Sequence, residues 1–166
     1  VFLQSNQNEA GEYDFSGLLP EQVQGFGLGV MAARCAYYAR QLGVSEETLR
    51  VYGPHGQGLI CANSCGPDYD ATLSAELTEK TRTANLRVRE LGFKPYLAPA
   101  LSSAAVSILR LVRGQEHFGA VPLGGAYFGC RSRMTPFGVS LVREKIAPAL
   151  LGELQKTHAA LEAFRY

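Results

Sequence analysis

The segment Gly53-Pro54-His55-Gly56-Gln57-Gly58 constrains the fold more than any other, because it forces the chain to reverse direction. It separates two short apolar segments, 49–52 and 59–62, each of which has the length of a β-strand. Glycine adopts the backbone angles that tight turns require, and proline fixes its own φ angle. The pattern therefore predicts a β-hairpin with a histidine at its tip.

The remaining pattern predicts helices on both sides of this hairpin and short strands late in the chain. Hydrophobic residues at helical spacing predict helices over about 20–42, 68–91, 100–113 and from Pro148 onward. The third of these is so apolar that we expect it to be largely buried. Short strands are predicted at 1–5, 118–123, 127–131 and 139–142, and a loop at 7–17. This order predicts an α+β domain with helices packed on one face of a mostly antiparallel, twisted sheet.

Three glycines interrupt the first predicted helix. Gly25, Gly27 and Gly29 each cost a helix about 1 kcal/mol relative to alanine. We therefore expect either that another part of the protein approaches this backbone closely or that the helix begins later than its apolar pattern suggests.

Length, charge and cysteine usage indicate the class of protein. The 166 residues suit one domain, which we place over 1–166, and a net charge of +1 with no Lys/Arg run argues against nucleic-acid binding. No apolar run reaches the ~20 residues of a membrane helix, and 1–5 does not resemble a signal peptide. Four cysteines in a chain of this length are expected to be reduced thiols. We therefore expect a cytoplasmic protein.

Two side chains are candidates for chemistry. His55 lies between glycines, where a ligand can come close, and an imidazole of near-neutral pKa suits proton transfer. Arg34 lies on the first helix beside its apolar stripe, where a guanidinium can bind a carboxylate through two parallel hydrogen bonds. The simpler alternatives are a surface turn histidine and an arginine whose stem packs on the helix while its head reaches water.

Two other motifs point to binding sites that we do not favour. Gly27-Leu28-Gly29-Val30-Met31-Ala32 fits the dinucleotide pattern G-x-G-x-x-A, but the residues before it do not form the hydrophobic strand that this pattern requires. Cys61 and Cys65 together with His55 resemble part of a zinc site, but no second ligand pair follows. We expect no metal.

Taken together, these elements resemble the C-terminal domain of lactate and malate dehydrogenases over nearly the whole chain. Val51-Tyr52-Gly53-Pro54-His55-Gly56 is similar to the family's Gly-x-His-Gly motif, and Val30-Met31-Ala32-Ala33-Arg34 to its Leu-Asp-x-x-Arg motif. The resemblance implies that His55 relays a proton, that Arg34 binds the substrate carboxylate, and that Asn6 orients the substrate carbonyl. It also implies NAD, bound mainly by an N-terminal Rossmann half that these residues do not include, a small 2-hydroxy or 2-keto acid as substrate, and a homo-oligomer.

The sequence departs from this family at three positions. Met31 stands where the family has the aspartate that holds the histidine, Gln7 replaces a proline, and Pro95 lies near a threonine position of the site. Without the aspartate we expect the imidazole to lose both its stabilising partner and its fixed tautomer, which can cost orders of magnitude in rate. A catalytically degenerate member that acts as a binding or oligomerisation module is therefore the alternative. A related NAD-dependent glycosidase is a third reading, for which Cys35 beside Arg34 is the only sign.

Overall fold

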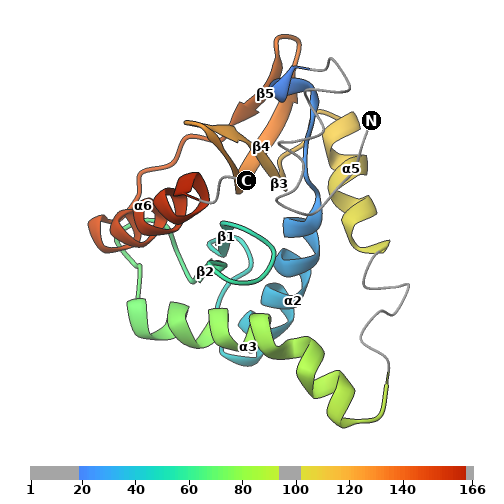
Figure 1. Cartoon of the computed structure of the whole chain (residues 1–166). Helices are drawn as coiled ribbons and strands as arrows, with labels where there is room; N and C mark the ends of the chain where they lie inside the picture. The colour runs from blue at the N-terminus through green and yellow to red at the C-terminus, as the bar shows by residue number, and fades with distance from the viewer. Residues whose placement is uncertain (1–18, 94–101, 164–166) are drawn as a thin grey trace.

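The computed structural model describes residues 19–93 and 102–163 and has the predicted α+β class (Figure 1). The predicted strand at 1–5, the loop at 7–17, Asn6 and Pro95 lie outside the described residues. The elements are η2 (Pro20–Gln22), α2 (Gly27–Gln41), β1 (Arg50–Tyr52), β2 (Ile60–Ala62), α3 (Ala71–Glu90), α5 (Ala104–Val112), β3 (His117–Leu123), β4 (Ala126–Thr135), β5 (Gly138–Leu141) and α6 (Pro148–Ala163).

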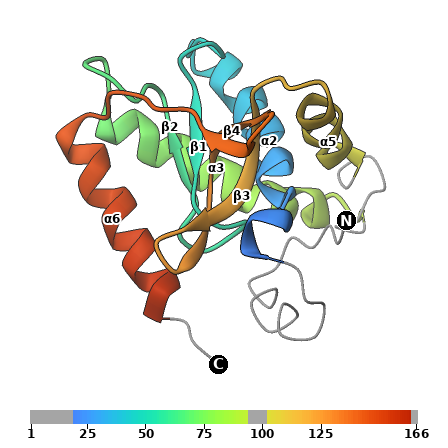
Figure 2. The same ribbon diagram turned by 90° about the horizontal axis from the view of Figure 1, so that it is seen from above.

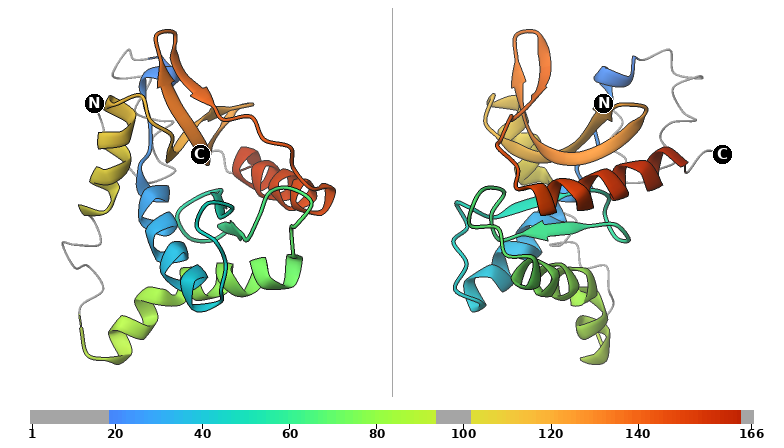
Figure 3. Two further views of the ribbon diagram at one scale, coloured as in Figure 1. Left: turned by 180° about the vertical axis from the view of Figure 1, so that it is seen from behind. Right: turned by 90° about the vertical axis from the view of Figure 1, so that its left-hand side faces the viewer.

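The strands form two antiparallel sheets. β1 pairs with β2 in the predicted hairpin, and β3, β4 and β5 form a three-stranded meander in that order. The hairpin lies between α3 on one side and the three-stranded sheet on the other, and α6 contacts both β2 and β4 (Figures 2 and 3). A hydrogen bond from the Gly53 N–H to the Gly129 carbonyl, 2.8 Å long, joins the end of β1 to β4.

The first long helix begins seven residues later than its apolar pattern suggests. Pro20–Gln22 forms a single 3-10 turn, and α2 begins only at Gly27. Gly25 instead pairs with Ala120 of β3 through two backbone hydrogen bonds, at 3.1 and 2.7 Å. At Gly29, an added Cβ would overlap the hydroxyl of Ser107 in α5. Both expectations from the glycines are therefore met: the helix starts late, and a neighbouring helix approaches its backbone.

The prediction that the apolar helix after residue 100 is largely buried was wrong. In α5 only Ser107 is buried, whereas Val106, Leu109 and Val112 are exposed. α5 packs against α2, β3 and β4, and this leaves Val106, Leu109 and Val112 uncovered by the described residues. Apolar composition predicts that a face needs a partner, but it does not say that the same chain supplies this partner.

A shared core fixes α2 and α3 against the hairpin. Met31 and Cys35 of α2, Leu77 of α3 and Val51 of β1 are almost completely buried in one cluster. Asp70 begins α3, because its carboxylate accepts a hydrogen bond from the Leu73 N–H at 2.9 Å. Of the described helices, none is long and apolar enough to cross a membrane.

Candidate functional site

The loop that carries His55 is held against the three-stranded sheet. Gly53 takes a φ of 83°, in the left-handed region that favours glycine, at the point where the chain leaves β1. A Cβ at Gly129 would overlap the carbonyl oxygen of Gly53, so β1 and β4 meet at van der Waals distance without side chains between them. The position of the hairpin tip is therefore set by two glycines that are 76 positions apart along the chain.

The imidazole of His55 is held by the first turn of α2. Its Nδ1 lies 3.0 Å from the carbonyl oxygen of Gly27. A carbonyl oxygen only accepts hydrogen bonds, so Nδ1 carries the proton and Nε2 of the neutral imidazole is an acceptor. The expectation that the loss of the aspartate leaves the tautomer unfixed is therefore wrong, because a backbone carbonyl fixes it.

Arg34 lies two turns further along α2. Met31 and Arg34 follow Gly27 at spacings of four and seven residues, which places all three on one side of the helix. The Nη1 of Arg34 lies 3.9 Å from the Sδ of Met31, which is a weak acceptor. Burial lowers the pKa of the Arg34 guanidinium from its usual value, while Tyr38 opposes that shift. Within 19–93 and 102–163, no carboxylate forms an ion pair with Arg34.

The structure therefore places two of the three predicted site residues on one side of α2. His55 contacts the beginning of this side, and Arg34 projects from it two turns later. The third residue, Asn6, lies outside the described part of the chain. Among the described residues, the half-buried guanidinium of Arg34 has no carboxylate partner, and such a group suits an organic anion.

The two other sequence motifs have structural explanations. The G-x-G-x-x-A segment follows an isolated β-bridge instead of a strand, and Ser107 of α5 packs directly against Gly29 within it. Cys61 is completely buried in the core, away from solvent. No group of three or more potential ligands among the described His, Cys, Asp and Glu side chains could hold a metal ion.

Known proteins with this fold were found by structure alone. Neither a protein-family model nor a curated protein matches the sequence. Malate dehydrogenase from Archaeoglobus fulgidus in complex with NADH superposes with a TM-score of 0.71 at 17% identity, over 91% of this chain and 54% of that one. The fold is that of the malate dehydrogenase C-terminal domain.

Two further malate dehydrogenases agree with this assignment. The enzyme from Aeropyrum pernix gives a TM-score of 0.67 at 19% identity, and the enzyme from Plasmodium falciparum gives 0.66 at 18% identity. Each match covers 91% of this chain and 57% of the other. The chain thus spans about half the length of these malate dehydrogenases, with their fold and little of their sequence.

Sequence reasoning did not identify the carbonyl of Gly27 as part of this site. A backbone carbonyl leaves no residue-type signature, since any residue at position 27 would supply one. The one available sign was the glycine cluster itself, which indicated a close approach to this backbone without showing what approaches it.

Proposed function

We propose that this chain is the substrate-binding half of an NAD-dependent dehydrogenase that acts on a small 2-hydroxy or 2-keto acid. The observation that carries the proposal is the half-buried Arg34, which forms no ion pair with a carboxylate among the described residues and lies two turns along α2 from the carbonyl that holds His55. At 17–19% identity, the likeness to malate dehydrogenases shows the fold alone. The reaction class is therefore part of our proposal.

The chemistry follows from the two side chains. Arg34 binds the substrate carboxylate through a charge-assisted pair, which offsets the cost of its own burial. Nε2 of His55 accepts the hydroxyl proton as the hydroxy acid is oxidised, and it returns this proton in the reverse direction. The Gly27 carbonyl keeps the imidazole in the tautomer that this step needs. Asn6 would orient the substrate carbonyl, as the family resemblance implies.

The nicotinamide cofactor requires residues outside the described part of the chain. NAD would accept the hydride. The dinucleotide-like segment that begins at Gly27 is not a suitable site for it, because Ser107 of α5 packs directly against Gly29. We therefore assign NAD binding to an N-terminal Rossmann half, which the length of the malate dehydrogenase matches suggests. Four free thiols suit a reducing compartment such as the cytoplasm.

The test joins this chain to its nucleotide-binding half and measures NADH oxidation with 2-keto acids. We expect Arg34→Leu to raise KM strongly and His55→Asn to lower kcat, because the first residue binds the substrate and the second transfers the proton. Turnover that is unchanged in both His55→Asn and Arg34→Leu would exclude this site.

A binding or oligomerisation module without activity is the second candidate. Two observations favour it: Met31 in the aspartate position, and the exposed apolar face of α5, where the exposed fraction of Val112 reaches 77%. Exposed apolar faces of this kind often mark contacts between subunits. In this reading a second copy of the chain covers Val106, Leu109 and Val112.

Sedimentation velocity tests whether the chain self-associates through α5. If the chain self-associates through α5, Leu109→Lys with Val112→Lys should yield monomers, whereas a change on the exposed side of α3, such as Leu86→Lys, should not. Self-association together with turnover would indicate an oligomeric enzyme, and self-association without turnover would leave the module as the better description.

A further inference from the structure

A hollow lies between α6, the three-stranded sheet and the end of β1, apart from Arg34 and His55. Its volume is about 390 Å³, and neither candidate site residue lines it. Pockets that hold small molecules commonly measure roughly 300–1,000 Å³ and are mostly apolar with a few polar groups. We propose that this hollow, which we call the α6 pocket, binds a neutral, mainly apolar small molecule.

The walls of the α6 pocket are apolar on two opposite sides. Leu123 and Phe128 line it from the sheet, and Leu151 and Leu154 line it from α6. Phe128 and Leu154 are themselves buried, so they form a fixed base, while Leu123 and Leu151 are partly exposed at the rim. A ligand that enters would therefore cover apolar surface that the described residues leave open to water.

The charged groups of the α6 pocket compensate one another. Glu144 accepts hydrogen bonds from Arg50 at 2.6 Å and from Arg131 at 3.2 Å, and Arg131 also pairs with Glu116. His158, a further lining side chain, lies 3.3 Å from a carboxylate oxygen of Glu162. Both basic side chains that line the pocket, Arg131 and His158, thus have a carboxylate partner, and neither is left unpaired to attract an anionic ligand. An added charge would have to compete with these pairs, so the pocket favours a neutral molecule.

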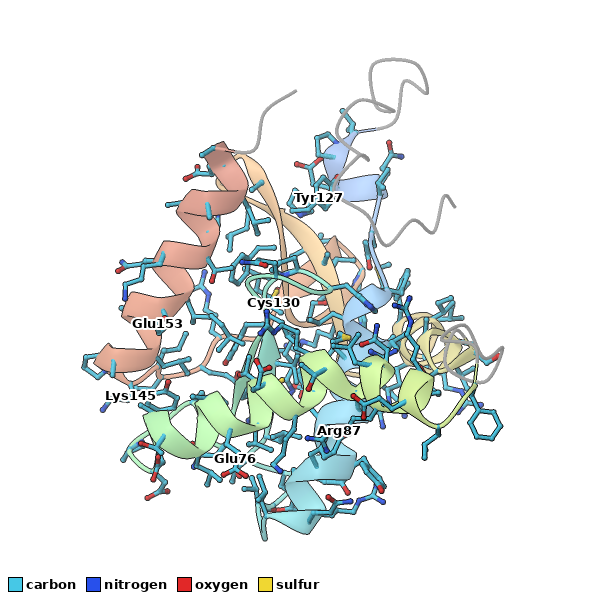
Figure 4. All side chains as sticks on the ribbon, turned by 60° about the horizontal axis from the view of Figure 1, so that its bottom comes forward. Glu76, Arg87, Tyr127, Cys130, Lys145 and Glu153 are labelled. Carbon is cyan, nitrogen blue, oxygen red and sulfur yellow. The ribbon has the colours of Figure 1, made fainter. Side chains whose placement is uncertain are left out.

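One polar end of the pocket can orient such a molecule. The hydroxyl of Tyr52 donates to Glu144 at 3.4 Å, which leaves the hydroxyl oxygen able to accept a hydrogen bond. Cys130, which is labelled in Figure 4, also lines the pocket and is partly buried. Burial raises the pKa of the Cys130 thiol to about 12, so the thiol adds no negative charge to the pocket.

The test uses two fluorescent probes that differ by one charged group. N-phenyl-1-naphthylamine is neutral, and its 8-sulfonate is the same molecule with an anion attached. With the full chain at pH 7, we expect the neutral probe to bind saturably at one site, with a dissociation constant on the order of 10 µM. The sulfonate should bind at least tenfold more weakly, because the pocket offers it no unpaired cation.

Two variants close the pocket from different sides. Leu151→Trp fills it from α6 and Leu141→Trp from β5, and both positions are partly exposed, so at least one should fold normally. Each should weaken binding of the neutral probe tenfold or more. Leu86→Trp on the exposed side of α3 adds the same side chain outside the pocket and should leave binding unchanged.

Several results would overturn the proposal. Equal binding of both probes would show that charge does not select the ligand, and unchanged binding in both folded Trp variants would place the probe elsewhere. The same titration on a longer polypeptide that contains this chain must give the same single site, because loss of binding there would show that the pocket is filled by the protein itself. None of these outcomes depends on turnover, so they are independent of the proposed dehydrogenase activity.

Discussion

At the scale of single residues, the contact between His55 and Gly27 replaces a side-chain interaction with a backbone one. The residue types at positions 34 and 55 could be predicted as candidates, because arginine and histidine carry their chemistry in the side chain. The Gly27 carbonyl could not, because every residue carries one. The sequence therefore predicted an imidazole without a fixed tautomer, whereas the structure holds the ring at 3.0 Å from a carbonyl oxygen.

The tautomers of two histidines should be opposite. Nδ1 of His55 faces the Gly27 carbonyl. Nε2 of His158 faces the Leu123 carbonyl at 2.6 Å, which is closer than the 3.3 Å between its Nδ1 and a Glu162 carboxylate oxygen. We expect the proton on Nδ1 in His55 and on Nε2 in His158 when both rings are neutral. A two-dimensional ¹⁵N–¹H correlation spectrum of the imidazoles at pH 8 reports both assignments at once. A proton on Nε2 of His55 would contradict the role given to Gly27.

A buried histidine should make stability depend on pH. Burial lowers the pKa of His117, whose ring contacts the Gln115 carbonyl and the Ser132 hydroxyl at 3.3 and 3.4 Å. The unfolded chain, with a histidine pKa of about 6.5, then binds a proton before the folded chain does. The contribution of this neutral ring is fully present above that pH and is lost as pH falls below it, toward the lowered folded-state pKa.

The free energy of unfolding in urea at pH 7.5 and 5.0 measures this effect. The parent chain should lose more stability between these values than His117→Gln does, since the variant has no group there to protonate. An equal loss in both proteins would mean that His117 does not contribute to the acid sensitivity.

At the scale of elements, whether a segment forms a helix or a strand was easier to predict than where it begins or what packs against it. The hairpin, α3, the three late strands and α6 follow directly from turn residues and periodicity. The predicted start of α2 was wrong because the backbone N–H and carbonyl of Gly25 form hydrogen bonds with Ala120 and are not available to a helix. The burial of α5 was wrong because burial depends on what packs against a helix, and this information is not local to it.

The close approach of β1 and β4 leaves no room for an added methyl group, so such a group should lower the stability of the protein. In Gly129→Ala the added Cβ would overlap the Gly53 carbonyl, which belongs to the backbone and cannot turn aside. We expect a loss of about 2–4 kcal/mol in the free energy of unfolding.

Gly152→Ala is the matched control, because nothing lies within 4 Å of a Cβ at that position of α6. This change should be neutral or should stabilise the chain by up to about 1 kcal/mol, as alanine favours helix over glycine. Urea denaturation of both variants gives the comparison, and a Gly129→Ala protein as stable as the parent would contradict the close approach of these strands.

At the scale of the whole molecule, the chain has the fold of roughly half a malate dehydrogenase, and its candidate site combines features from two elements. Neither α2 nor the hairpin contains the site alone: α2 supplies the cation and the carbonyl, and the hairpin supplies the imidazole. The shared core of these elements fixes their relative position. The central claim is therefore that one small anion is bound by Arg34 and His55 together.

An NMR titration of the chain with lactate tests this claim most directly, with lactamide as the uncharged control of the same shape. We predict that the Arg34 Nε–H and His55 Cε1–H signals shift together with one dissociation constant, on the order of millimolar, and that lactamide binds at least tenfold more weakly. Arg34→Leu should abolish the lactate response at His55. Signals that shift with different midpoints, or equally with lactate and lactamide, would contradict a shared anion site.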